Sequence, residues 1–426
     1  MWKSGILLGP VVLVLALLAM GGVEAQQQQR GSLRQPAQCE GPDCEVRPRV
    51  RNVRAIKRAK PAPAPAPQAK KKPLERTPYT EQEAEAAIVP GLPGVRFWAD
   101  SLGAFSAALS QEKGPWLILS SGGSTGAYGA GILCGWSTTG KRPDFSVVTG
   151  VSIGALMAPY AFLGQKYDDQ LRDGFLTLTS ADVFEDAMRA DSLLDTWPLK
   201  DLMVKRVTPE LLADIAAEHR KGRRLFVITA NLDSERPVAW NMGAIAAHGG
   251  EAAVNLFRQV LLAASAIPGL FPPVLIDVEA NGRKFQEMHA DGGVFAPFFA
   301  APATWLVEPA SEQLPASQFY VIVHSKLVPE FSVTDAEKIF ILGHTISAAV
   351  KAGAQAEIAL LSTAAKHDNI GLSVAYLDGS FNQPAQTAFD QKQMKALFDL
   401  GFQQGKDGTA FHTQNSAASG QAETKP

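Results

Sequence analysis

The stretch of the sequence best suited to chemistry is Gly150-Val151-Ser152-Ile153-Gly154, a serine between two glycines at a bend. An apolar, strand-like run precedes it and an apolar, helix-like run follows it. A Gly-x-Ser-x-Gly turn between a strand and a helix holds its serine on a tight elbow, and the glycines relieve crowding so that the hydroxyl projects at the edge of a sheet. The pattern predicts that Ser152 is a nucleophile. The alternative is that it is only a small residue at a turn.

A second turn of interest lies one strand and one helix upstream, in WLILSSGGSTGAYGAGIL. A strand-like run leads into a Gly-rich turn from Ser121 to Gly126, and a helix is expected to start near Ala127. Glycines let successive backbone N–H groups converge on one point, and the amino terminus of a helix favours negative charge. The turn is therefore predicted to bind an anion, either a phosphate or the transient oxyanion of an acyl transfer.

Two nucleotide-binding patterns use turns of similar composition. A dinucleotide site needs an acidic residue at the end of the next strand to hold the ribose, and here that strand ends in VVTGVSIG, without an acid. A Walker loop needs a lysine followed by serine or threonine, and the turn contains no lysine. Both comparisons argue against a nucleotide site.

A serine hydroxyl needs a base to remove its proton before it can attack. Asp291, in QEMHADGGVFAPF, follows a short strand-like run, and Gly292 and Gly293 allow a sharp turn that presents the carboxylate. His324, after the apolar run FYVIV, is the best placed of the seven histidines for a Ser-His-Asp hydrolase. From the residues alone both bases remain open, and so does an ordinary Asp-Gly turn. His289 shares a strand face with Asp291 by period two and is a candidate supporting residue.

The elements that would position these residues alternate along the chain. Strand-like runs (WLILSS, FSVVTGVS, RLFVITANL, FYVIVHS) are interspersed with helix-like ones (AYGAGILCGW, IGALMAPYAFLG, EAAVNLFRQVLLAASAI and residues 336–364). Such alternation predicts an α/β layered fold with a largely parallel sheet. Ligands in such sheets bind at the carboxyl ends of the strands, which is where both turns lie.

Composition sets the limits of this domain. The chain has 426 residues, 46% of them hydrophobic, and a formal net charge of -2. It can bury a large core, and it has no overall basicity that would suggest nucleic acid as a partner. We predict a globular domain over residues 89–405 and a disordered tail over residues 406–426.

The first residues have the pattern of a secretory signal. A weakly positive start at Lys3 is followed by ILLGPVVLVLALLAM, and small residues stand at Val23 and Ala25. We predict a signal peptide over residues 1–25 and export, either to the periplasm or to full secretion. The alternative is an uncleaved membrane anchor, because the apolar run approaches the roughly 18 residues that span a bilayer.

Residues 26–88 differ in composition from the rest of the chain. The segments RPRVRNVRAIKRAK, PAPAPAPQ and KKKPLER lack periodic apolar residues and repeat proline. They predict a disordered, basic, Pro-rich linker. Its basic residues either contact an anionic membrane peripherally or, as the simpler alternative, are only solvated. Cys39 and Cys44 are five residues apart and are expected to close a small disulfide loop, whereas Cys134 is expected to be buried. No metal site is expected.

The Gly-rich turn, the serine elbow and the Asp-Gly-Gly motif, in this order, resemble the patatin-like phospholipase family, and in particular its exported bacterial members. ASAIPGLFPPV, residues 264–274, also looks like the family's segment before the aspartate strand. The resemblance covers residues 116–302. It implies a three-layer fold with a central, mainly parallel sheet flanked by helices.

The resemblance also implies an activity, that of a serine acyl hydrolase of the phospholipase or lipid esterase type. Ser152 and Asp291 would form a catalytic dyad that cleaves fatty acyl esters through an acyl-enzyme, without a cofactor or a metal. The oxyanion would be held by backbone N–H groups of the Gly-rich turn, and further glycines would support the motifs. The implied oxyanion residues are Gly122, Gly123 and Ser124, and the supporting glycines are Gly126, Gly150, Gly154, Gly292 and Gly293.

The chain departs from the family at two positions of the loop. Ser121 stands where the family has its first glycine, and Thr125 stands at the family's basic position. A strong preference for anionic head groups is therefore in doubt, and a catalytically weak lipid-binding protein or a partner-activated effector of the same fold remains an alternative. Residues 155–163 and 264–271 would supply apolar surface for an acyl chain or, as core helices, only packing.

Overall fold

The computed structural model describes residues 75–110, 112–186, 191–307, 313–331, 333–334 and 338–413. The predicted signal peptide, the predicted linker up to residue 74 and the Cys39–Cys44 pair lie outside the described residues, as does the predicted tail from residue 414.

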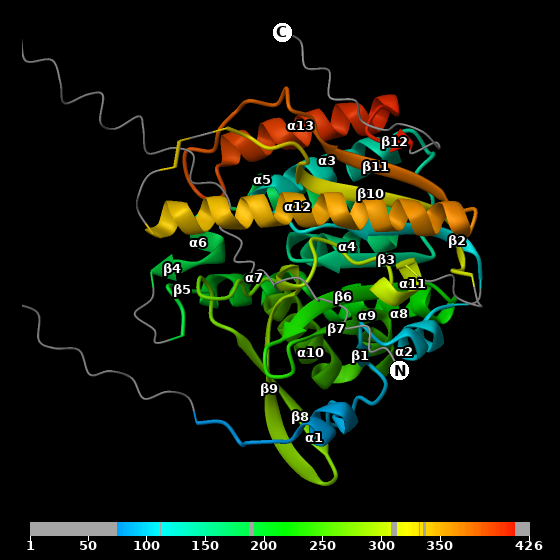
Figure 1. The fold of residues 1–426 in the computed structure, drawn as a ribbon, viewed down its shortest axis with the longest axis vertical. Coiled ribbons are helices and arrows are strands. Elements are labelled where there is room, and N and C mark those ends of the chain that lie inside the picture. The colour runs from blue at the N-terminus through cyan, green and yellow to red at the C-terminus, as the bar shows by residue number, and fades with distance from the viewer. Residues whose placement is uncertain are drawn as a thin grey trace, which may run out of the picture. The chain divides into compact units, whose positions relative to one another are not determined.

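The centre of the fold is a mixed sheet whose described strands run in the order β1-β7-β6-β3-β2-β10-β11-β12 (Figure 1). The five strands from β6 to β11 in this order are parallel to one another, and the remaining strands are antiparallel. β9 lies beside β6, and β8 pairs with β9. The bounds are β1 (Arg96–Trp98), β2 (Gly114–Leu119), β3 (Val147–Val151), β6 (Arg224–Asn231), β7 (Arg236–Asn241), β8 (Val274–Ala280), β9 (Arg283–Asp291), β10 (Ala316–Lys326), β11 (Gly371–Leu377) and β12 (His412–Thr413).

Helices cover both faces of the sheet. β2 shows why, because its alternate side chains enter two different buried clusters: Leu117 and Leu119 pack on one face, and Trp116 and Ile118 on the other. A strand that is apolar on both faces must be covered on both. The first face carries α3 (Gly126–Ser137), α4 (Ile153–Leu163), α5 (Asp168–Leu176), α7 (Trp197–Arg206), α8 (Pro209–Arg220), α9 (Met242–His248), α10 (Gly250–Ala264) and α13 (Gln391–Asp407).

The opposite face carries α2 (Leu102–Ala108), α11 (Ala303–Val307) and the long helix α12 (Lys338–His367), which crosses the sheet in front of β10 (Figure 1). The prediction of a three-layer α/β fold with a central, mainly parallel sheet is confirmed. Each of the four strand-like runs and four helix-like runs coincides with a strand or helix of the structure.

The predicted linker extends to residue 88, and this boundary is wrong. The segment has few apolar residues, but it contains α1 (Glu81–Ala86), which begins with a reciprocal pair of hydrogen bonds between Thr80 and Glu83. Arg76 pairs with Asp233 at 2.5 Å, and Tyr79 stacks on Phe285. Polar and ring contacts, rather than an apolar stripe, hold it in place.

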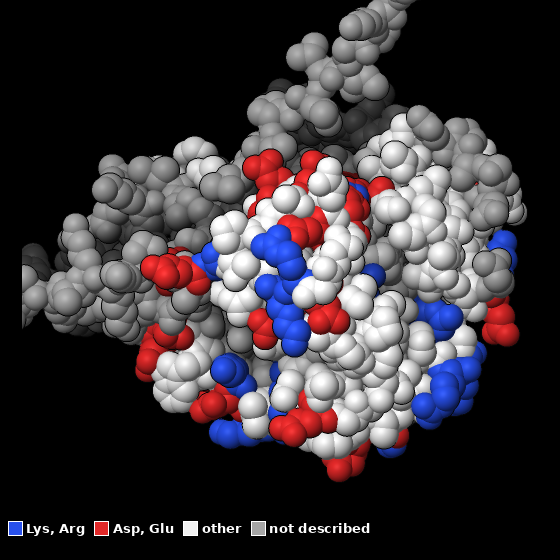
Figure 2. All heavy atoms as spheres, turned by 90° about the horizontal axis from the view of Figure 1, so that it is seen from below, with Lys and Arg blue, Asp and Glu red and all other residues white. Residues whose placement is uncertain are grey.

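Figure 2 shows the face that carries α1 and the β8–β9 hairpin, where basic and acidic side chains are interspersed.

The predicted disordered tail begins too early at residue 406, because α13 reaches Asp407 and β12 pairs with β11.

Candidate active site

The sheet brings Ser152 and Asp291 together through β6. β7 lines one edge of β6, and β3 lines the other until Val151 pairs with Ile228, where β3 ends. β9 takes over that same edge at the next position, with Asp291 opposite Thr229. Ser152 therefore leaves β3 at the point where Asp291 arrives on β9, although 139 positions separate them in the sequence.

The elbow holds Ser152 in a conformation that few residues with a side chain adopt. Its φ of 56° lies in the left-handed region, between the end of β3 and the first turn of α4. The flanking glycines are required by close backbone contacts, because a Cβ on Gly150 or on Gly154 would lie 2.5 Å from a carbonyl oxygen. Strained backbone of this kind costs about 1–3 kcal/mol and persists only where the surroundings enforce it.

Asp291 is 3% exposed and only partly hydrogen-bonded. Its Oδ1 accepts the N–H of Gly293 at 2.8 Å, and its Oδ2 has no partner of ordinary hydrogen-bond length among the described residues. Burial raises the pKa of Asp291 to about 6, opposed by the Ser152 hydroxyl, which lies near enough to act as a donor, and by the Gly293 N–H. Oδ2 is thus the atom free to take the Ser152 proton.

The Gly-rich turn forms a short 3-10 helix, Gly123–Thr125, that leads into α3. Pro297 O accepts the N–H of Ser121 at 2.7 Å, and Gly122 O accepts the N–H of Thr125 at 3.2 Å. Within the described residues, no turn or loop hydrogen bond uses the N–H groups of Gly122, Gly123 or Ser124. These three N–H groups are available to an oxyanion, and their role in holding one stays a prediction.

His324 lies beneath this turn and does not reach Ser152. Its Nδ1 is 2.8 Å from the carbonyl oxygen of Ser120, and its backbone N–H donates to the Ser120 hydroxyl at 2.9 Å. Since a carbonyl oxygen only accepts, Nδ1 carries the proton. Nε2 points at Gly129, where a Cβ would lie 2.3 Å away. Burial lowers the pKa of His324 to about 4, so the ring is neutral. His324 supports the turn rather than acting as a base.

His289 belongs to a buried polar network below Asp291. Its Nδ1 lies 3.0 Å from Oγ1 of Thr229, and its Nε2 lies 3.2 Å from the carboxylate of Glu287. Arg96 binds the same carboxylate through both terminal nitrogens. Since Thr229 is also the partner of Asp291 on β6, this network fixes the strand pair that carries the aspartate.

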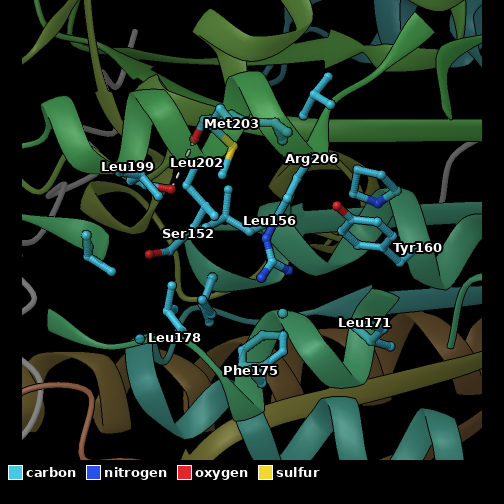
Figure 3. A pocket seen from close by; sticks show the side chains of 18 of the residues that line it. Ser152, Leu156, Tyr160, Leu171, Phe175, Leu178, Leu199, Leu202, Met203 and Arg206 are labelled. Carbon is cyan, nitrogen blue, oxygen red and sulfur yellow. Dashed lines mark hydrogen bonds between the residues drawn. The ribbon is translucent and has the colours of Figure 1, made fainter. Parts of the chain in front are cut away.

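Ser152 opens into an apolar cavity between helices (Figure 3). Leu156 and Tyr160 extend from it along α4, Phe175 comes from α5, and Met203 and Arg206 come from α7. Of residues 264–271, Ser265, Ile267 and Phe271 line the cavity. Most of residues 155–163 are buried in the core, which agrees with the alternative that this helix serves packing. The contribution of α5 and α7 was not foreseen from the sequence.

The model of the patatin-like phospholipase family matches residues 117–304. These residues belong to the patatin-like phospholipase family. The matched range contains the elbow, the Gly-rich turn and Asp291. A solved structure, VipD from Legionella pneumophila, is similar over 71% of this chain and 68% of that chain, with a TM-score of 0.38 and 13% identity. No curated protein sequence matches the chain at a significant level.

Membership of the patatin-like phospholipase family implies lipid acyl hydrolysis and a lipid substrate. The described part of the patatin domain contains no group of three or more His, Cys, Asp or Glu side chains suited to a metal ion. Cys134 is buried in α3, as expected, and its thiol pKa is raised to about 12 by burial. Among the described helices, none combines the length and the apolarity needed to cross a membrane.

Proposed function

We propose that this protein is an exported serine acyl hydrolase that cleaves fatty acyl esters through Ser152 and Asp291. One observation carries the proposal: a serine on a strained elbow stands beside a buried carboxylate and lines an apolar cavity. The family supplies the reaction class, and the geometry supplies a role for each group.

The first half of the reaction transfers the acyl group to the enzyme. Oδ2 of Asp291 takes the proton of Ser152 as its Oγ attacks the ester carbonyl, and the N–H groups of Gly122, Gly123 and Ser124 stabilise the oxyanion. The tetrahedral intermediate collapses when Asp291 returns the proton to the departing alcohol, which leaves an acyl ester on Ser152.

The second half releases the acid. Water replaces the alcohol, Asp291 removes its proton, and the hydroxide attacks the acyl carbonyl in the same oxyanion site. Ser152 regains its proton from Asp291, and the fatty acid leaves. A carboxylate is a weaker base than an imidazole, so esters suit the dyad better than amides do.

The raised pKa of Asp291 fits both duties. A carboxylate with a pKa of about 6 is ionised at neutral pH and is a stronger base than an ordinary aspartate. Oδ2 accepts no hydrogen bond of ordinary length from the described residues, so this oxygen stays available.

The test measures hydrolysis of a chromogenic medium-chain ester and of a phospholipid by the full chain and by three variants. Ser152→Ala and Asp291→Asn should abolish turnover, and His324→Ala should leave a measurable rate. A wild type inactive on both substrates, but activated by added membranes or a partner extract, would favour the effector alternative. Full activity of Asp291→Asn would refute the dyad.

Export is tested separately by expressing the full chain in a bacterial host and fractionating the cells. Recovery outside the cytoplasm, starting after Ala25, is the expected result. Recovery in the cytoplasm with an intact amino terminus would contradict export, and recovery in the membrane with residues 1–25 retained would support the anchor.

A further inference from the structure

Arg206 is the one charged residue among those that line the cavity in the described part of the chain. It ends α7, one turn beyond Leu202 and Met203, which line the same wall. Figure 3 shows its guanidinium reaching into the cavity, between Ser152 and Tyr160 in that view. One terminal nitrogen lies against α5, where a Cβ on Gly174 would be 2.8 Å away.

The guanidinium makes no hydrogen bond or ion pair with any described residue. Other enclosed arginines differ: Arg142 pairs with Asp168 at 2.7 Å, and Arg223 pairs with Glu218 at 2.8 Å. Arg220 also lacks a described partner, but it lies exposed on the surface. A guanidinium held half-buried against apolar walls loses part of its hydration, and two oxygens of a phosphate or carboxylate would replace the lost interactions with a pair of parallel hydrogen bonds.

Nearby carboxylates do not neutralise Arg206 directly. Asp182 is close enough for Arg206 to act on its charge, but its carboxylate accepts the N–H and the hydroxyl of Thr179 at 2.9 and 2.6 Å. These bonds engage Oδ2 of Asp182 in capping α6 (Ser180–Val183), and no hydrogen bond or ion pair joins Asp182 to Arg206. The Gly-rich turn from Ser121 to Gly126 contains no basic residue. Among the described residues that line the cavity, Arg206 therefore supplies the positive charge.

The place of Arg206 relative to Ser152 follows from α4. Leu156 and Tyr160 line the cavity one and two turns beyond Ser152, so Tyr160 lies about 12 Å along the helix axis from it. Burial raises the pKa of Tyr160, and the nearby charge of Arg206 opposes that rise. Gln170 at this end is exposed, so Arg206 marks the more open end of the cavity, away from Ser152.

We propose that Arg206 binds an anionic oxygen group, a phosphate or a carboxylate, carried by the ester whose carbonyl is presented to Ser152. The inference rests on the proposed function and narrows its substrate class to acyl esters with an anion at one end. The anion comes either from a phosphate on the alcohol or from a carboxylate at the far end of the acyl chain. The guanidinium binds both in the same way.

The binding test does not depend on catalysis. The full chain carrying Ser152→Ala is titrated calorimetrically with dodecyl phosphate and with dodecanol, and the ratio of the two affinities is the measured quantity. Adding Arg206→Met, which keeps most of the aliphatic stem, should lower this ratio about tenfold, because the charge-assisted hydrogen bonds to the phosphate are lost at a partly solvated site. Arg206→Lys keeps the charge but loses the fork, and it should retain part of the ratio.

Lys205→Met is the matched control, since Lys205 is adjacent on α7, exposed, and outside the cavity lining. It should leave the ratio unchanged. An unchanged ratio in Arg206→Met, or an equal fall in Lys205→Met, would overturn the proposal. If the wild type proves inactive while Arg206→Met still lowers the ratio, the proposed hydrolase function fails and the anion site survives.

Kinetics then identify the source of the anion. With Ser152 intact, kcat/KM is compared for a monoacylglycerol phosphate against the monoacylglycerol, and for an ester with a terminal carboxylate against its methyl ester. The charged substrate of one pair should be preferred by the wild type and lose about tenfold of that preference in Arg206→Met. If the wild type prefers neither charged substrate, no ester anion reaches Arg206 and the proposal is wrong.

Discussion

Replacing Asp291 with asparagine should change the pH dependence of stability in a direction set by its burial. The pKa of Asp291 is raised from 3.8 to about 6 in the folded protein, chiefly by burial. The folded state therefore holds this proton more tightly than the unfolded state does. Stability contributed by the protonated carboxyl is present below pH 3.8 and is lost as the pH rises to about 6.

The difference between 3.8 and about 6 corresponds to about 3 kcal/mol. Asparagine has no such titration, so the free energy of unfolding of Asp291→Asn, relative to the wild type, should rise by about 3 kcal/mol between pH 3.8 and pH 8. The new amide also leaves a buried N–H₂ beside Ser152, but that cost does not change with pH. This constant cost cancels when the stability difference between variant and wild type at one pH is subtracted from that at another.

The assay is urea unfolding of both proteins at several pH values, followed by circular dichroism. Asp390→Asn is the control with the opposite sign, because Asp390 caps α13 and backbone N–H groups of Gln386, Gln393 and Lys392 lower its pKa. Its native carboxylate stabilises the fold at neutral pH, and this contribution is lost as the pH falls. A difference between Asp291→Asn and the wild type that stays constant from pH 3.8 to pH 8 would refute the buried, poorly solvated carboxylate.

Three further predictions concern activity. The acid limb of the pH profile of kcat/KM for the wild type should have a midpoint at about 6, because Asp291 must be ionised to accept a proton; a midpoint near 4 would contradict the raised pKa. His324→Ala should lower kcat by about tenfold to a hundredfold, less than the 10²–10³ that follows loss of an oxyanion donor, because His324 acts only by holding the turn. Complete loss of activity in this variant would instead support a Ser-His-Asp triad. Leu202→Trp should shift the preferred substrates toward shorter acyl chains by filling the cavity, whereas Val204→Trp, on the exposed side of the same helix, should not. Chain-length profiles that match in the two variants would place the acyl chain elsewhere.

The sequence predicts most of the sheet because its central strands are continuous apolar runs. β2, β3, β6 and the central part of β10 are buried on both faces, so their composition stands out from the helices between them. The two turns can be predicted for the same reason, since each lies at the end of such a run and requires glycine at sterically closed positions.

The cavity could not be predicted in the same way. Its walls on α5 and α7 carry apolar residues such as Leu171 and Met203, whose spacing is the same whether a helix packs on the core or lines a cavity. Nor does the sequence show that β9 follows β3 along one edge of β6, because strand order depends on the whole sheet. The position of Arg206 within the cavity depends on both.

His324 illustrates a different limit. A histidine at the end of a central strand is placed as a catalytic base would be, and only the hydrogen bond from Nδ1 to Ser120 shows that it is used for support. The start of the folded domain was missed because Thr80, Glu83 and Arg76 are held by caps and ion pairs, which leave no apolar pattern.

The central claim is that an acyl group passes through Ser152 with Asp291 as the base. Its most direct test is to mix the full chain with a slowly released medium-chain acyl ester, quench in acid before steady state, and map the modified peptide by mass spectrometry. One acyl group on Ser152 is expected in the wild type and none in Ser152→Ala or Asp291→Asn. Turnover without an acylated Ser152, or an acyl group on another residue at catalytic rates, would contradict the account.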